Sequence, residues 1–316
     1  MLTRALLRTK AAQVLYANFQ ADNSAVAMQN ELEFSLQKTY DLYFFLLLLP
    51  IEITKIAQKS VLIAEKKMLK PKDKDNINAL AKLVENKFSQ KLSENQVFIE
   101  YVERRKLSWL PYVEQLQDIF STLKKTDFLA EYAMSSENSF KNDKKFWRCF
   151  FQSNWIFDKT FEEFLEDLSV YWVDDLEIVR SFVDKTVDFY KQYALDDSKN
   201  IFPLYKDDDD RIFIKKIAQR AFERSKEYDK MILPFLRDWE LKRLAQIDIV
   251  LLKMAIAEIE LFFEIPVSIT MNEYIEIAKY YGTKNSQVFI NGILDKIVKY
   301  MRVQGILNKI NEISVK

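Results

Sequence analysis

Two features of the chain could carry chemistry: a run of four carboxylates, Asp207 to Asp210, and a single cysteine, Cys149. Neighbouring carboxylates can hold a divalent cation, but a contiguous acidic run is more typical of a solvated loop. A lone thiol can form neither an internal disulfide nor a thiolate zinc site, and no base is visible to activate it. We therefore expect a solvated loop at 207–210, a buried inert thiol, no metal site and no catalytic residue.

The overall composition also argues against an enzyme. The chain has no histidine, which removes the commonest general base and metal ligand. It has only three glycines, and their positions match neither a dinucleotide-binding motif nor a P-loop motif, so no cofactor is expected. The 47 basic and 47 acidic residues balance, so any nucleic-acid site must be a local patch.

The sequence favours a cytoplasmic protein that does not enter a membrane. No signal peptide is evident at the amino terminus, and the longest apolar run, Leu42 to Pro50, is too short to span a bilayer. The absence of disulfide-forming cysteine pairs agrees with a reducing compartment.

The elements that must position any site are helices, since glycine and proline are scarce and stretches rich in Leu, Ile, Lys and Glu are long. The first helix is predicted over residues 3–20, with one apolar stripe formed by Leu7, Ala11, Val14, Leu15 and Phe19. Arg4 and Arg8 are four residues apart, so they share one face of the helix, outside the apolar stripe. Lys10 also lies outside the stripe. No acidic residue precedes Asp22, so these cations should be available to a polyanion.

Residues 25–203 are predicted to form a packed, aromatic-rich helical region. Within it, residues 141–148 alternate basic and aromatic side chains, a pattern found on surfaces that bind single-stranded nucleic acid. The alternative is a helix with a solvated basic side and Phe146 and Trp147 in the core. The sequence leaves both readings open.

The last third of the chain predicts a series of helices. An amphipathic helix is expected over 211–229, and a mostly apolar, central one over 249–262 with Asp248 as its cap. Thr270 and Glu273 have the spacing of a capping box for the next helix.

Two glycines delimit a turn and a final helix. Gly282 is placed to end the preceding helix in a left-handed conformation, and Asn285 or Ser286 can cap the next one. Gly292 falls inside that last helix, where glycine is less stable than alanine by about 1 kcal/mol. We expect the close approach of another helix to compensate for this loss of stability.

The order of residues in this last third resembles the NusB family of transcription antitermination factors. The resemblance covers residues 1–20 and about 208–300. It is carried by these motifs, in chain order: Trp239-x-x-x-Arg243-Leu-x-x-Ile-Asp248, Leu252-Lys-x-Ala255-x-x-Glu258, Ile265-Pro-Val, Asn272-Glu-x-Ile-Glu-Ile-Ala-Lys279, Tyr281-Gly and Phe289-Ile-Asn-Gly-Ile-Leu-Asp-Lys296. The first helix adds Arg4, Arg8, Ala11, Gln13 and Leu15-Tyr16.

The resemblance implies an all-α bundle made of the first helix (1–24) and residues 206–316, with residues 25–205 as a helical insertion or an enlarged subdomain. The family's second helix cannot be placed in this longer region. The resemblance also implies a non-enzymatic protein that pairs with NusE, a small-subunit ribosomal protein, and binds the boxA element of nascent ribosomal RNA. The pair then helps RNA polymerase resist termination.

Site residues follow from matching positions. The RNA face is expected to contain Arg4, Arg8, Lys10, Gln13, Tyr16, Tyr281, Lys284 and Asn285. Exposed tyrosines would stack on unpaired bases, although Tyr16 could equally be packed in the core. The partner face is expected to contain Glu223, Tyr228, Glu240 and Glu258.

Two other functions remain open at this stage. The chain could be a protein-interaction scaffold that keeps the fold without binding RNA, which the zero net charge and the few arginines of the first helix favour. It could also act beside an enzyme that modifies ribosomal RNA, since NusB-like domains are found fused to such enzymes. Nothing in the chain supplies the glycine-rich cofactor domain or the catalytic cysteine motif of those enzymes.

Overall fold

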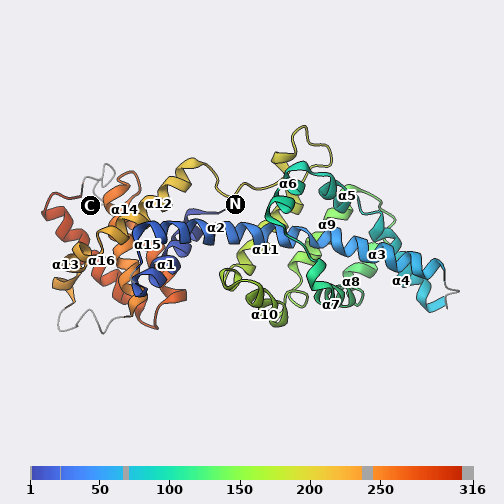
Figure 1. Cartoon of the computed structure of the whole chain (residues 1–316), viewed down its shortest axis with the longest axis horizontal. Helices are drawn as coiled ribbons and strands as arrows, with labels where there is room; N and C mark the ends of the chain where they lie inside the picture. The colour runs from blue at the N-terminus through green and yellow to red at the C-terminus, as the bar shows by residue number, and fades with distance from the viewer. Residues whose placement is uncertain (1, 22, 67–70, 237–244, 308–316) are drawn as a thin grey trace. The chain divides into compact units, whose positions relative to one another are not determined.

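The computed structural model describes residues 2–21, 23–66, 71–236 and 245–307, with the backbone only for 71–76 (Figure 1). Its α-helices are α1 (Arg4–Gln20), α2 (Ala25–Leu47), α3 (Leu49–Glu65), α4 (Pro71–Val84), α5 (Lys87–Glu94), α6 (Gln96–Arg105), α7 (Val113–Leu123), α8 (Asp127–Met134), α9 (Phe140–Gln152), α10 (Lys159–Leu168), α11 (Leu176–Phe189), α12 (Asp208–Glu223), α13 (Ser225–Ile232), α14 (Gln246–Leu261), α15 (Val267–Tyr281) and α16 (Ser286–Val303). Four short 3-10 turns, η1 (Leu110–Tyr112), η2 (Val170–Trp172), η3 (Asp197–Asn200) and η4 (Leu233–Phe235), complete the regular structure of the described residues, apart from a bridge between Leu2 and Tyr205. The predicted all-α fold is confirmed.

The chain divides into two compact units. Unit 1 contains residues 1–36 and 204–316, and unit 2 contains residues 37–203. The two ends of the sequence therefore fold together, while the middle of the chain forms a core of its own.

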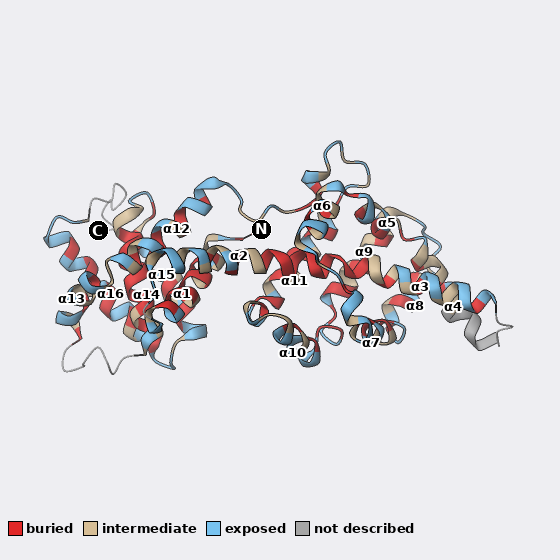
Figure 2. Cartoon of the chain, viewed as in Figure 1, coloured by how far each residue is buried: buried red, intermediate tan, exposed pale blue. Residues whose placement is uncertain are grey.

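Helix α14 is the centre of unit 1, as the sequence predicted. It packs against α1, α12, α13, α15 and α16, and every residue from Val250 to Ile259 is buried (Figure 2). A helix that is apolar on most of its faces is stable only when neighbours cover all of them. The expected cap is wrong, because α14 begins at Gln246 and Asp248 lies inside its first turn.

Helix α1 begins where predicted, and Thr3 caps it by accepting a hydrogen bond from the Leu6 amide. Its apolar stripe is buried from Leu7 to Leu15, against α12, α14 and α15. Phe19, at the end of the stripe, is half-buried and stacks on Phe222 of α12 with ring centroids 5.4 Å apart.

The acidic run is not the solvated loop that the sequence suggested. Asp207 accepts a hydrogen bond from the Asp210 amide, 3.0 Å away, and so caps α12, while Asp208 to Asp210 form the first helical turn. Carboxylates are favoured there because the amino-terminal end of a helix carries a partial positive charge. The single helix predicted over 211–229 is in fact α12 and α13, which meet at Arg224.

Two further predictions for the last helices are wrong. Helix α15 begins at Val267, so Thr270 and Glu273 are not a capping box, and the Thr270 side chain is buried inside the bundle. Gly292 is exposed, and a Cβ atom added to it would meet nothing within 4 Å. Close helix packing therefore does not explain this glycine.

Unit 2 has an aromatic core. Trp109, the residue before η1, stacks between rings of α2 and α10, with 4.2 Å between the centroids of Phe45 and Trp109 and 5.8 Å between those of Trp109 and Phe164. Phe146 and Trp147 of α9 are buried, so these two rings cannot stack on bases. The prediction that residues 141–148 form a base-stacking surface is therefore wrong. Cys149, expected to be buried, is half-buried.

The part of the chain that the structure describes contains no helix long and apolar enough to cross a membrane. In the same residues, no group of three or more acidic or cysteine side chains could hold a metal ion.

Candidate nucleic-acid interface

One exposed surface joins the two segments that were predicted to contact RNA. The Gln13 side-chain amide donates a hydrogen bond to the Tyr281 hydroxyl at 3.4 Å, which places α1 beside the end of α15. Tyr16 lies one turn after Gln13 on α1, and Lys284 and Asn285 follow Tyr281 in the turn to α16. We call these five residues, Gln13, Tyr16, Tyr281, Lys284 and Asn285, the α1–α15 face.

The side chains of this face are accessible. Tyr16 is 39% exposed and Tyr281 is 36% exposed, so each tyrosine presents part of its ring to solvent. Lys284 and Asn285 are also exposed. Asn285 occupies the cap position of α16 but its side chain makes no capping hydrogen bond. The face therefore combines aromatic rings, one amine and two amides, the groups that recognise unpaired nucleotides.

A buried serine holds the turn between α15 and α16 in place. The Ser286 hydroxyl accepts a hydrogen bond from the Thr283 amide at 2.7 Å and donates one to the Asp248 carboxylate at 2.9 Å. Ser286, which the sequence offered as a possible cap of this helix, is buried and anchors the turn. Because the turn is held from inside, Lys284 and Asn285 are left on the outside.

Gly282 permits this arrangement by its size and not by its backbone conformation. Its φ of −88° and ψ of −177° are extended, so the predicted left-handed conformation is wrong. A Cβ atom at this position would lie 2.4 Å from the Ser286 Cβ and 2.6 Å from the Ala278 carbonyl oxygen. Any side chain would push Ser286 away from the turn.

Asp248 is buried below the turn. One carboxylate oxygen accepts the bond from Ser286, while the other, Oδ1, is buried without a hydrogen-bond partner among the described residues. Burial raises the pKa of Asp248 above its ordinary value, and the bond from Ser286 only partly offsets this effect.

Arg8 is buried, although it was predicted to be an exposed RNA contact. Its side chain is 4% exposed, and its guanidinium is bonded to Glu258 at 2.7 Å and to Glu273 at 3.0 Å. Burial by itself lowers the pKa of Arg8, but the hydrogen bond to Glu258 and the nearby negative charges outweigh it and raise the pKa above the ordinary value. Arg8 therefore holds α1 to α14 and α15.

The other two cations of α1 also differ from expectation. Lys10 is 2% exposed, so its placement on an exposed RNA face is wrong. The Arg4 side chain is 40% exposed, but its Nε donates to Asp210 at 2.7 Å and its guanidinium lies over the Phe213 ring. Arg4 can reach solvent only in part, and much of its charge is compensated by Asp210.

The predicted partner residues do not form one surface. Glu258 and Tyr228 are fully buried, so neither can contact a partner, and the Tyr228 hydroxyl donates to Glu260 at 2.7 Å. Glu223 is exposed and accepts a hydrogen bond from Gln219. Glu240 lies outside the described residues, as do Trp239 and Arg243 of the family motif.

The NusB family model matches residues 171–299. That range extends into unit 2 and does not include α1, so the first-helix motif is not part of the match.

Curated relatives carry the name transcription antitermination protein NusB. The protein of Salinibacter ruber is 38% identical over 107 residues, which are 34% of this chain and 67% of the relative. That of Geobacter sulfurreducens is 32% identical over 123 residues, 37% of this chain and 89% of the relative. The Thermoanaerobacter sp. protein is 36% identical over 123 residues, which are 38% of this chain and 87% of the relative.

Comparison with solved structures gives no match. The assignment rests on sequence: the family model matches, and this chain covers 67% of the Salinibacter ruber relative and 89% of the Geobacter sulfurreducens relative. The chain belongs to the NusB family.

Proposed function

We propose that the protein is a transcription antitermination factor that binds single-stranded, boxA-like RNA through the α1–α15 face. It does so together with NusE, acts on elongating RNA polymerase in the cytoplasm, and makes or breaks no covalent bond. The names of its relatives support antitermination. The observation that carries the RNA assignment is the hydrogen bond between Gln13 and Tyr281, because it brings two exposed tyrosines and Lys284 onto one surface.

Phosphate contacts on this face are few. Arg8 and Lys10 are buried and Arg4 is paired with Asp210, which leaves Lys284 as the exposed cation of the face. Binding by this face alone should therefore depend weakly on salt, and NusE would supply the remaining affinity.

The test is a titration of labelled boxA RNA at several salt concentrations, with and without NusE. Replacing Lys284 by alanine should reduce the slope of log K against log salt by about 0.7, the value for one phosphate contact on a single strand. Lys299→Ala is the matched control, because Lys299 is an exposed lysine on α16 that pairs with Asp295. If no salt-sensitive binding appears even with NusE, the RNA assignment is wrong.

A protein-interaction scaffold without RNA binding is the second candidate. The burial of Arg8 and Lys10 favours it, since both were expected to contact phosphates. Binding of NusE in the absence of any RNA binding would support this candidate over the first.

A further inference from the structure

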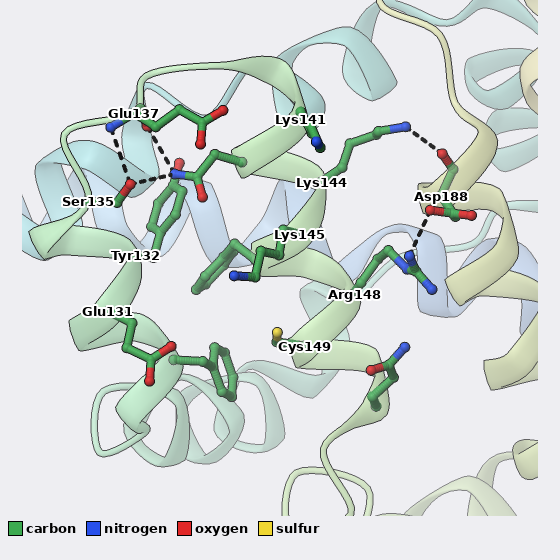
Figure 3. A pocket seen from close by; sticks show the side chains of 14 residues that line it. Glu131, Tyr132, Ser135, Glu137, Lys141, Lys144, Lys145, Arg148, Cys149 and Asp188 are labelled. Carbon is green, nitrogen blue, oxygen red and sulfur yellow. Dashed lines mark hydrogen bonds and ion pairs between the residues drawn. The ribbon is translucent and has the colours of Figure 1, made fainter.

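A cavity of about 680 Å³ lies in unit 2 between α8 and α9 (Figure 3). Its volume falls in the range of sites for small molecules. Residues of three chemical kinds line it: cations on α9, a half-buried aromatic ring on α8, and three acids, namely Glu131 on α8, Glu137 before α9 and Asp188 on α11.

Two cations of α9 are free to bind an anion. Lys141 and Lys145 are exposed, four residues apart on one helical face, and have no ion-pair partner among the described residues. In Figure 3, Lys145 extends from α9 towards α8. Two lysines one helical turn apart, with no carboxylate partner among the described residues, give this part of the cavity a positive charge that favours a phosphate.

The other two cations of α9 neutralise the acids on the opposite side. Arg148 donates to Asp184 at 3.1 Å and to Asp188 at 2.7 Å, and Lys144 donates to the carbonyl oxygens of Asp188 and Tyr190. Figure 3 shows Lys144 and Arg148 directed towards Asp188, away from Lys145. The positive charge of Lys141 and Lys145 is therefore not cancelled by these aspartates.

The side of the cavity formed by α8 carries an aromatic ring and a carboxylate instead of cations. Phe128 is half-buried, with its ring centroid 5.6 Å from that of Phe146, and it can pack against a planar group. Glu131 is exposed on the same helix, and the contacts described leave its carboxylate unpaired.

We propose that this cavity binds one nucleotide unit, with its phosphate on Lys141 and Lys145 and its base beside Phe128 and Glu131. A nucleotide carries an anionic group at one end and a flat ring at the other. A carboxylate accepts a hydrogen bond from the exocyclic amine of cytosine, so Glu131 favours cytosine over uracil, which has no such amine. The nucleotide is either free or part of an RNA strand.

Cys149 offers a local reporter of binding. It is the only cysteine of the chain, it is half-buried, and it lines the same cavity opposite Glu131 (Figure 3). The rate at which a chromogenic disulfide reagent labels the full-length protein is measured with cytidine 5′-phosphate, uridine 5′-phosphate, inorganic phosphate and a short oligocytidine. Protection by oligocytidine at lower concentration than by the mononucleotide indicates an RNA strand as the source, and the reverse order indicates a free nucleotide.

Cytidine 5′-phosphate should slow labelling, uridine 5′-phosphate should require a higher concentration, and Glu131→Ala should remove that difference. Lys141→Glu with Lys145→Glu should weaken protection about tenfold or more, measured against the unliganded rate of the same variant. Lys55→Glu with Lys59→Glu is the matched control, because these exposed lysines are also four apart, on α3. Unchanged labelling with every nucleotide, or equal protection in the Lys141/Lys145 variant, would overturn the proposal. Because Cys149 lies in unit 2, the result does not depend on RNA binding by the α1–α15 face.

Discussion

Arg8 of α1 makes two parallel hydrogen bonds, each 2.7 Å long, to the carboxylate of Glu258 of α14, a residue 250 positions later in the chain. The hydroxyl groups of Thr270 and Tyr274 donate to the same carboxylate, each at 2.9 Å. The Glu258 charge is thus buried but fully bonded. This network fastens the first helix to the last third of the chain and so positions the α1–α15 face.

Replacing Arg8 by methionine should destabilise unit 1 by about 3–5 kcal/mol, because it leaves the Glu258 charge buried without its cation. The free energy of unfolding in urea is the measurement. Adding Glu258→Leu to the same protein should recover part of the loss. A loss below about 1 kcal/mol in the single variant would show that the pair does not hold the helices together.

Replacing Gly292 by alanine should stabilise the protein by about 0.5–1 kcal/mol. The residue is exposed inside α16, a Cβ atom there meets nothing within 4 Å, and alanine has the higher helix propensity. Thermal unfolding of the two proteins provides the comparison. A destabilised variant would support the earlier prediction that Gly292 is required for close helix packing.

The same change at Gly282 should have the opposite sign. An added Cβ atom would lie 2.4 Å from the Ser286 Cβ, and overpacking of this kind costs about 1–3 kcal/mol. Gly282→Ala should also weaken RNA binding, since it displaces the turn that carries Lys284. Equal stability of the Gly282→Ala and Gly292→Ala proteins would contradict the predicted difference in sign.

Replacing Asp248 by asparagine should change how stability depends on pH. The pKa of Asp248 is raised in the folded protein, so its ionisation destabilises the fold at pH values above that pKa. This cost disappears as the pH falls towards the unfolded value of about 3.9. The wild-type protein should therefore gain stability relative to Asp248→Asn as the pH is lowered, which urea unfolding at a series of pH values will measure. A difference independent of pH would show that Asp248 does not titrate as described.

Replacing Tyr16 by alanine should weaken binding of boxA RNA by about 1–3 kcal/mol, the usual value for one stacked base. Tyr16→Phe should bind almost as well as the wild type, because it keeps the ring. The slope of affinity against salt should not change, which distinguishes stacking from a phosphate contact. If alanine and phenylalanine have the same effect, Tyr16 does not stack on the RNA.

The sequence by itself determined the fold class, the apolar stripe of α1 and the central position of α14. These features depend on local periodicity and composition, which are visible in a single stretch of chain. The order of residues from Asn272 to Lys296 also pointed to the family, and the family model confirmed it.

Only the tertiary structure decided which polar residues are available to a ligand. Arg8 was predicted to be free because no acid precedes Asp22, yet its partners Glu258 and Glu273 come from the far end of the chain. The role of Gly282 depends on where the turn places Ser286 and Ala278, each only four residues away, and not on a left-handed backbone preference. Ion pairs and steric contacts between distant segments follow from how helices pack, and a pattern within one helix does not contain that information.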